Sequence, residues 1–364
     1  MSNPPITSPA PNPRLELVAI PESAVAEVAR FIAGQSGREP AQVESHLRWF
    51  LLENPARILD VPLGYGLRAP DGRLVGCILC APQKFRYEGR DLVLMGSSCF
   101  YVDEPFRGRG GLIFLKFSEL AREWPLFGNS ANADAARLWK ARGAMPIPFS
   151  DHELFGVIHW GPILEEVLYR KSVRRGPWNL IGKLASPFSA IFARMKLACD
   201  GSESLSRLTS ADDVVALPIH QATPKLTAAR DLPYLRWRYF SRRDSTVTVF
   251  AFRSRGVENP VLVTVNRRPR GYRQQINTLN LLDIYPEVTP EVCASIVGAL
   301  MQQYRESVDA IVLRGLDERS QQLFCDLGFK RRQFDSPNGW MLDRSNRLPT
   351  RHWHFVPADG DWLI

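Results

Sequence analysis

The chain has 364 residues, of which 45% are hydrophobic and 23% are charged, a composition that excludes a disordered chain and leaves room for two globular domains. Its formal net charge of +8 favours an anionic partner, such as a nucleotide cofactor, an acidic membrane surface or RNA, without choosing among them. The six scattered cysteines suit reduced, buried thiols better than a disulfide framework.

The start of the chain, residues 1–14, is rich in proline and small polar residues and predicts a disordered tail. It contains no apolar segment of signal-peptide length. No uninterrupted apolar stretch in the chain reaches the roughly 18 residues that a spanning helix needs. These observations predict a cytoplasmic protein.

Two helices are predicted next, because apolar residues recur at helical spacing in 21–33 and again after Pro40. The pattern then changes to the shorter, turn-bounded runs that are typical of antiparallel strands. The predicted strands are 65–68, 74–81 and 92–102.

A loop rich in arginine and glycine follows the third strand and precedes a predicted helix over 112–123. A strand, a glycine-rich turn and a helix start aim backbone N–H groups and the positive helix end at one point, which suits a phosphate or pyrophosphate. Glycine also lets the backbone approach the anion closely. The sequence therefore predicts a phosphate site at Arg107, Gly108, Arg109, Gly110 and Gly111.

After a predicted strand at 126–128 and a helix at 132–142, the second half repeats the order of the first. Leu47-Arg48-Trp49 recurs as Leu235-Arg236-Trp237, and the helix that ends at Gly143 recurs as one that ends at Gly328, at nearly the same offset. This spacing favours two copies of one domain over chance recurrence of a short triplet. Between the second Leu-Arg-Trp triplet and the helix that ends at Gly328, the sequence predicts strands at 246–252, 261–266 and 275–284 and a helix at 290–306.

The two copies differ in the loop between the third strand and the following helix. In the second copy this loop runs from Tyr285 to Pro290 and contains no glycine. Pro286 and Pro290 lack an N–H donor, and Glu287 adds a negative charge. We therefore expect a phosphate-bearing ligand in the first copy and not in the second.

The segment 167–199 between the copies carries seven Arg and Lys residues, no acidic residue, and interleaved aromatic and aliphatic side chains. Such a segment could contact an anionic membrane surface or an RNA backbone. The simpler interpretation is a linker with a packed helix and solvated charges. Both interpretations stay open, and the first predicts peripheral membrane association.

Two features look like partial metal sites. Cys77 and Cys80 have a zinc-like spacing, but positions three apart in a strand point to opposite faces and no second pair completes four ligands. His352 and His354 share a face if the tail is extended, for which a solvent-facing edge strand is the simpler interpretation. No metal site is predicted.

The loop over Arg107–Gly111 resembles the coenzyme A motif of the GNAT family of acyl-coenzyme A transferases. The whole chain resembles the tandem GNAT proteins that are often associated with bacterial surface polysaccharide. Members place Gln/Arg-x-x-Gly-x-Gly/Ala between the fourth strand and the third helix, which Arg107 and Gly110 match. Leu112 departs from the final Gly/Ala, and Gly111 precedes it. The resemblance covers about residues 15–150 well and 205–343 more faintly.

A later family motif, Asn-x-x-Ala-x-x-Leu-Tyr before a glycine, is matched by Asn132, Ala135 and Leu138. Trp139 stands where the family has tyrosine, and the repeat has Phe324 there. In many members that tyrosine protonates the departing thiolate, which an indole N–H is too weak an acid to do.

The resemblance implies an α+β fold with two GNAT-like domains in tandem, each a mixed, mostly antiparallel sheet flanked by helices. It implies acetyl-CoA or another acyl-CoA as the bound substrate, and no metal. The expected parts are a tail over 1–14, an acyl-CoA-binding domain over 15–160, a basic amphipathic linker over 161–204, a degenerate GNAT-like domain over 205–343 and a tail over 344–364. The residues expected to contact the coenzyme are Val102, Arg107, Gly108, Arg109, Gly110, Gly111, Leu112 and Asn132.

The mechanism that the resemblance implies is direct attack of an amine on the thioester, with fourth-strand N–H groups stabilising the oxyanion. The polar residues nearest in sequence that could serve as the base are Asp103, Glu104 and His152. Each also has a structural interpretation, the two acids as loop carboxylates beside arginines and the histidine as a surface residue. Cys99, on the same strand, is expected to be a packing residue.

The implied function is therefore an N-acyltransferase that transfers an acetyl or other acyl group to a small-molecule or sugar amine. An amino sugar as acceptor rests on family association alone. The alternatives are a non-catalytic acyl-CoA-binding or scaffold protein and a FemAB-like aminoacyltransferase that uses aminoacyl-tRNA. A nucleic acid is not the expected partner, and the oligomeric state is not predicted.

Overall fold

The computed structural model describes residues 14–170, 203–214, 225–241, 246–254, 259–271, 274–349, 353–354 and 356–359. Most of the basic segment 167–199 and almost all of the predicted tail 1–14 lie outside these residues. The chain divides into two compact units, and each is described by itself. The described part of the first unit consists of 14–53, Arg57–Ala81 and Ser97–Leu120; the second holds the remainder.

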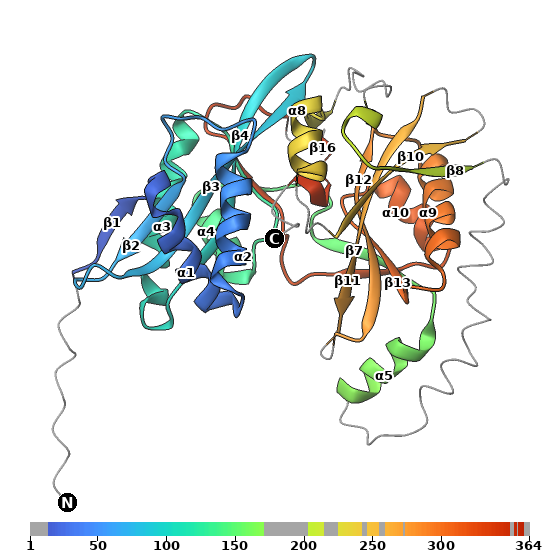
Figure 1. Ribbon diagram of the computed structural model, residues 1–364, viewed down its shortest axis with the longest axis horizontal. Helices are drawn as coiled ribbons and strands as arrows, with labels where there is room; N and C mark the ends of the chain where they lie inside the picture. The colour runs from blue at the N-terminus through green and yellow to red at the C-terminus, as the bar shows by residue number, and fades with distance from the viewer. Residues whose placement is uncertain are drawn as a thin grey trace, which may run out of the picture. The chain divides into compact units, whose positions relative to one another are not determined.

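The first unit contains the predicted pair of helices and the strands that follow them (Figure 1). Val25, Val28, Ala29, Ile32 and Ala33 are the buried positions of the first helix and recur at helical spacing. The strand order in this unit is β1-β2-β3-β4, and the β1–β2 and β2–β3 pairs are antiparallel. Its elements are β1 (Glu16–Ala19), α1 (Val25–Ser36), α2 (Pro40–Leu47), β2 (Gly64–Arg68), parts of β3 (Leu74–Tyr87) and β4 (Arg90–Val102), and α3 (Gly110–Glu119).

In the second unit, β5 pairs in parallel with the part of β4 that contains Met95 and Gly96. The strand order then continues β5-β15-β6, and the β5–β15 and β15–β6 pairs are both antiparallel. A short branch joins β9 to β3 and β16 to β9. The elements of this part are β5 (Leu126–Gly128), α4 (Ala133–Ala141), β6 (Met145–Pro146), β9 (Leu226–Ala228), β15 (Trp340–Leu342) and β16 (Trp353–His354).

A seven-stranded sheet forms the rest of the second unit, with the order β14-β7-β13-β12-β11-β10-β8 among the described residues. Helices α9 and α10 cover one face of it (Figure 1), and their apolar side chains form one core with Val263, Leu279 and Ile311. The strands are β7 (His152–Val157), β8 (Ser204–Leu208), β10 (Val247–Arg253), β11 (Val261–Arg270), β12 (Ile276–Tyr285), β13 (Ala310–Leu313) and β14 (Lys330–Gln333). The helices are α5 (Trp160–Arg170), α8 (Leu232–Leu235), α9 (Pro290–Tyr304) and α10 (Glu318–Asp326).

The two halves of the chain follow the same order of elements. Both Leu-Arg-Trp triplets lie where a short α-helix changes to a π-helical turn, over Arg48–Leu52 and Arg236–Phe240. Each half then has three consecutive strands, a helix and a strand parallel to the third, which is β5 beside β4 and β13 beside β12. The predicted fold class, mixed and mostly antiparallel sheets flanked by helices, is confirmed.

Each half also places a strand from its C-terminal part in the sheet of the other half. Strand β7, which follows α4 in the chain, lies between β13 and β14. Strand β15 lies between β5 and β6. This reciprocal exchange crosses the expected boundaries near residues 160 and 205, which themselves stay predictions.

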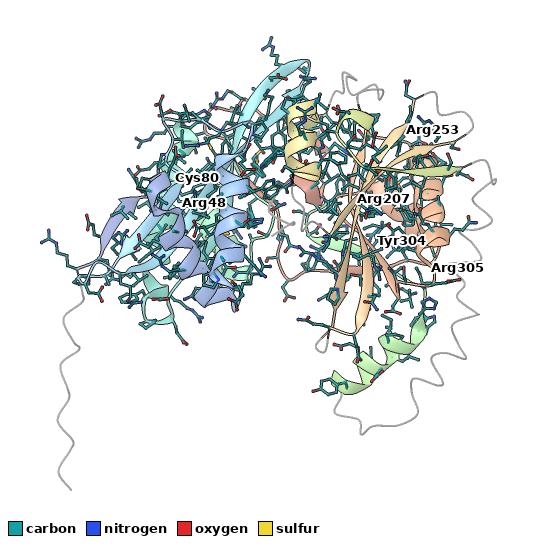
Figure 2. All side chains as sticks on the ribbon, in the orientation of Figure 1. Arg48, Cys80, Arg207, Arg253, Tyr304 and Arg305 are labelled. Atoms are coloured by element: carbon teal, nitrogen blue, oxygen red, sulfur yellow. The ribbon has the colours of Figure 1, made fainter. Side chains whose placement is uncertain are left out.

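The cysteines with described positions are free thiols, as their scatter in the sequence suggests. Cys77, Cys80 (labelled in Figure 2) and Cys293 are buried, and burial raises the pKa of each thiol. Such thiols are poor nucleophiles and poor metal ligands. Among the described residues no group of three or more His, Cys, Asp or Glu side chains is placed to hold a metal ion. No described helix is both long enough and apolar enough to cross a bilayer.

Among the described residues the tail forms a strand at the edge of its sheet, as the simpler interpretation expected, but His354 is half-buried rather than solvent-facing. Trp353 is buried, because β16 pairs with β9 and the indole joins a core cluster with Phe85 and Leu226. His354 Nε2 lies 3.2 Å from the carbonyl oxygen of Ile284. The residue expected to share its face, His352, lies outside the described residues.

Candidate functional site

The segment between β4 and α3, in the first unit, is helical rather than a glycine turn. A 3₁₀ helix spans Glu104–Arg109 and continues directly into α3, with the N–H of Gly110 bonded to the carbonyl of Arg107. Gly108, Gly110 and Gly111 therefore do not take the left-handed conformation. A tight turn with positive φ therefore does not explain why glycines occur here.

Gly110 is a packing glycine. A Cβ built on it would lie 3.2 Å from Val102 Cγ2 and 3.4 Å from Phe100, so the start of α3 lies directly on β4. Gly108, in contrast, has open space around the same position. Arg107, Gly108, Gly111 and Leu112 are exposed, so the first turn of α3 presents its backbone and one guanidinium to solvent.

Asp103, at the end of β4, anchors this segment. Its carboxylate accepts a hydrogen bond from Gln35 at 2.7 Å and forms an ion pair with Arg73 at 2.7 Å. Its N–H donates to the carbonyl of Val75. The carboxylate is thus committed to structure, which weakens its case as a base, whereas Glu104 is exposed in the first turn of the 3₁₀ helix.

Cys99, three residues before the end of β4, has a left-handed backbone with φ at +50°. This conformation is rare for a residue with a side chain and costs on the order of 1 kcal/mol or more, so it occurs chiefly where a structure needs it. It breaks the regular alternation of the strand and re-aims the backbone groups of Ser98 and Cys99. No sequence signal marks this position, because cysteine has no preference for positive φ.

Asn132 lies in the second unit, as the N-cap of α4, and accepts a hydrogen bond from the N–H of Ala135 at 2.9 Å. Capping accounts for this residue without a ligand. Trp139 on the same helix is 2% exposed and Phe324 on α10 is fully buried, so both replacements of the family tyrosine are core residues.

His152 opens β7 and is also in the second unit. Its Nδ1 lies 2.6 Å from a carboxylate oxygen of Asp151, and its Nε2 contacts the side-chain oxygen of Gln321. The ring is half-buried at the edge of a cavity that Asn129 and Arg314 also line. The histidine is therefore oriented on both sides, and the expectation of a surface residue is wrong.

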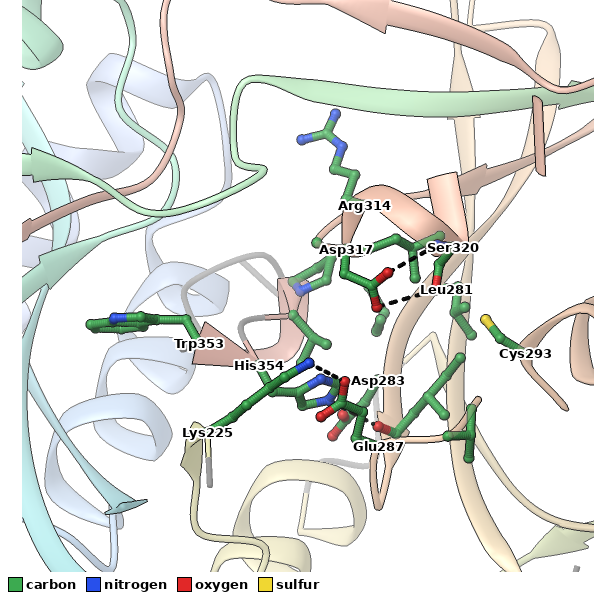
Figure 3. A pocket seen from close by; sticks show the side chains of 17 residues that line it. Lys225, Leu281, Asp283, Glu287, Cys293, Arg314, Asp317, Ser320, Trp353 and His354 are labelled. Carbon is green, nitrogen blue, oxygen red and sulfur yellow. Dashed lines mark hydrogen bonds and ion pairs between the residues drawn. The ribbon is translucent and has the colours of Figure 1, made fainter. Parts of the chain in front are cut away.

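The second half has a cavity where β12 and β13 diverge, after their last parallel pair at Asn280 and Val312 (Figure 3). Its volume is only about 40 Å³. Lys225 forms an ion pair with Glu287 across one side, and Trp353 and His354 from the tail line it. The protein's own side chains therefore fill most of the space between the diverging ends of β12 and β13.

A carboxylate with several arginine partners lies on β7, next to His152. Glu153 is 1% exposed and contacts Arg270 at 3.0 Å, Arg314 at 2.5 Å and Arg332 at 3.4 Å. Burial alone would raise the pKa of Glu153, but the positive charges of Arg314 and Arg270 outweigh it and hold the pKa below its ordinary value. None of these contacts was predicted, because they join residues more than 100 positions apart in the sequence.

This lowered pKa predicts a dependence of stability on pH. Because the folded protein holds Glu153 ionised, its contribution is complete above its ordinary pKa of 4.5 and is lost as the pH falls through the lower folded value. We expect Glu153→Gln to lower the free energy of unfolding at neutral pH and to flatten its decline below about pH 4.5. Urea unfolding at a series of pH values measures both, with the exposed Glu306→Gln as control. A variant curve parallel to that of the wild type would contradict the prediction.

Comparison with solved structures places the whole arrangement in a known fold. A probable N-acyltransferase from Enterococcus faecalis is 12% identical over 90% of this chain and 72% of its own, with a TM-score of 0.53. A GCN5-related N-acetyltransferase from Kribbella flavida is 13% identical, covering 90% and 71%, with a TM-score of 0.52. N-myristoyltransferase from Saccharomyces cerevisiae, with myristoyl-CoA bound, is 11% identical over 94% and 87%, with a TM-score of 0.54.

No family model and no curated protein matches the sequence. The likeness is therefore one of fold, and the fold is that of the GNAT proteins across about 90% of the chain. The tandem arrangement of two such domains stays a prediction.

Proposed function

We propose that this protein is an acyl-CoA-dependent N-acyltransferase and that the first unit holds the coenzyme. The observation that carries the proposal is the end of β4, where the left-handed Cys99 lies three residues before the last strand residue, and the junction of the following 3₁₀ helix with α3, where Arg107 and three glycines lie. A helix N-terminus with accessible backbone and a nearby guanidinium suits a pyrophosphate. The presence of myristoyl-CoA in the yeast neighbour, which shares the fold, supports an acyl-CoA.

In the proposed reaction the acceptor is an amine of a small molecule or sugar. Its nitrogen attacks the thioester carbon, the new C–N bond forms, and the C–S bond breaks to release coenzyme A thiolate. Backbone N–H groups that the Cys99 conformation re-aims would stabilise the oxyanion between these steps. The amine loses one proton. Within the first unit the exposed Glu104 is the better candidate for the base, because Asp103 is ion-paired with Arg73, and a role for His152 of the second unit stays a prediction.

The proton that the thiolate gains would come from water or from another side chain, since both positions of the family tyrosine hold buried residues, Trp139 and Phe324. The same observation favours a second candidate, a protein that binds acyl-CoA without turnover. An assay of free thiol release with a panel of amines separates the two, because a binding protein releases none. An amino sugar acceptor and membrane contact through 167–199 stay predictions.

Coenzyme A binding provides the direct test. We expect Arg107→Ala to weaken the binding of acetyl-CoA by at least about tenfold, the loss of one charge-assisted contact to the pyrophosphate. Arg122→Ala, an exposed arginine beyond the other end of α3, is the matched control and should change the affinity less than about twofold. Isothermal titration calorimetry measures both. Equal affinity of the two variants would refute the proposed coenzyme site.

A further inference from the structure

Helix α5, in the second unit, exposes apolar side chains that the proposed coenzyme site does not use. It lies beside the end of the β11–β12 hairpin (Figure 1), where a Cβ on Gly271 would meet the carboxyl carbon of Glu166 at 2.8 Å. Of the exposed large apolar side chains among the described residues, three belong to this one helix: Trp160, Val167 and Tyr169. Single exposed apolar residues are normal on a protein surface, but a group of them on one short element indicates an interaction surface.

Apolar residues form a stripe along one side of this helix. The members of the stripe recur at helical spacing and are Trp160, Ile163, Leu164 and Val167. Trp160 is 37% exposed and Val167 is 43% exposed, and the two residues between them are half-buried. The α5 stripe therefore presents an indole ring and aliphatic groups outward, a combination that is typical of side chains at the boundary between water and lipid.

The acidic residues of α5 do not interrupt the stripe. With 3.6 residues per turn, Glu165 and Glu166 project from the other side of the helix, as does the buried Gly161. Glu165 is half-buried and Glu166 is 4% exposed, and both have interaction partners within the protein. The exposed side of the helix thus carries no carboxylate that would repel an anionic surface.

The chain becomes strongly basic where α5 ends. Four cationic residues occur within six positions, Arg170, Lys171, Arg174 and Arg175, and the sequence 167–199 contains no acidic residue. Even a fully extended chain spans at most about 18 Å from the end of α5 to Arg175, so chain length alone keeps these charges near the helix. Positive charge and an apolar stripe therefore lie next to each other.

This combination matches an anionic lipid surface better than the other available partners. Headgroups of acidic lipids attract a cluster of Arg and Lys, and the acyl boundary below them accepts the stripe. An RNA backbone would use the charges and leave the stripe in water. A second copy of the chain would bury the stripe but would bring two basic clusters together, and like charges repel.

We propose that α5 and the basic residues that follow it dock this protein on an anionic membrane surface, with the helix in the plane of the interface and the α5 stripe toward the acyl chains. The docking goes beyond the proposed acyl transfer and does not rest on the coenzyme site. It requires no spanning helix, because an amphipathic helix binds at the depth of the headgroups.

Vesicle flotation of the full-length protein tests this docking. Phosphatidylcholine vesicles provide the neutral surface, and vesicles with about a third of phosphatidylglycerol provide the anionic one. We expect association with the anionic vesicles to be at least about tenfold stronger than with the neutral vesicles, and to weaken at high salt because the charges are screened. Absence of association with anionic vesicles, or equal association with both kinds, would overturn the proposal.

Val167→Asp tests the α5 stripe. It should weaken association with anionic vesicles at least about tenfold, because it places a negative charge where an apolar side chain enters the interface. Leu59→Asp, at a residue of the first unit that is 79% exposed, is the matched control and should change the association less than about twofold. Equal effects of the two variants would overturn the proposal. So would vesicle binding that stays unchanged while Val167→Asp dissociates an oligomer in light scattering, since a second copy would then be the occupant of the stripe.

Charge reversal tests the basic cluster. Arg174→Glu combined with Arg175→Glu should remove the preference for anionic vesicles. The control combines Arg207→Glu with Arg253→Glu, which changes the net charge equally at two exposed positions on the neighbouring β8 and β10 (Figure 2) and should keep the preference. Equal losses would show that net charge alone attracts the protein, which contradicts docking through α5. Acetyl-CoA affinity should be unchanged in all these variants, and Arg107→Ala should bind vesicles as the wild type does, so the two proposals fail separately.

Discussion

Replacing Arg230 by methionine is expected to lower the free energy of unfolding by about 3–5 kcal/mol, because it leaves two buried carboxylates without their common partner. Arg230 is fully buried and bonds Asp283 through Nε at 2.8 Å and Nη2 at 3.2 Å. Nη2 also lies 2.5 Å from Asp359. Burial opposes the charged form, but Asp283 and Asp359 outweigh it and raise the pKa of Arg230 well above its ordinary value.

The network joins three parts of the second unit that are far apart in the sequence. Arg230 follows β9, Asp283 lies on β12, and Asp359 belongs to the tail, where it also accepts a hydrogen bond from the N–H of Val356 at 2.9 Å. Tyr239 donates to Asp283 at 2.7 Å. Asp359 of the tail is therefore a counterion of the buried Arg230.

Urea unfolding measures the expected loss, with Arg236→Met as the matched control. Arg236 pairs with Asp212 at 3.4 Å, but both side chains are more than half exposed, so this substitution should cost about 0–1 kcal/mol. Similar losses in the two variants would show that the buried network does not hold the tail and β12 together.

Local patterns predicted most of the helices and strands because each has a clear period. The buried positions of α1 follow directly from apolar spacing, whereas β1, whose residues are mostly exposed, was not predicted. The reciprocal exchange of β7 and β15 could not be predicted, since Trp340–Leu342 is a suitable strand for either sheet and its partner is chosen by tertiary packing. For the same reason the partners of Glu153 were not predicted: Arg270 and Arg332 lie on two other strands, and Arg314 follows directly after a third.

The sequence predicted the position of the candidate coenzyme segment, between a strand and a helix, but not its helical conformation. Glycines after a strand indicate a turn when one of them takes positive φ, and here none of Gly108, Gly110 and Gly111 does. Gly110 instead allows α3 to pack closely on β4, whereas Gly108 has open space around it. The left-handed Cys99 had no signal at all, because strand neighbours impose its conformation.

Gly110→Val is expected to remove acetyl-CoA binding almost completely, by about a hundredfold or more, while the protein stays folded. The added side chain would meet Val102 and Phe100 at the distances of a close contact, so α3 must move away from β4. This movement displaces every donor at the helix start together, which is why the effect should exceed that of Arg107→Ala. The strain itself should cost about 1–3 kcal/mol of stability.

The matched control for this variant is Gly34→Val, the same change in α1, where a Cβ has open space. Calorimetry with acetyl-CoA gives the affinity, and thermal unfolding shows whether each variant is folded. We expect Gly34→Val to bind as the wild type does, because nothing at that position forces the helix to move. Undiminished binding by a folded Gly110→Val protein would mean that the helix start does not contact the coenzyme, and the pyrophosphate would then have to be sought elsewhere in the chain.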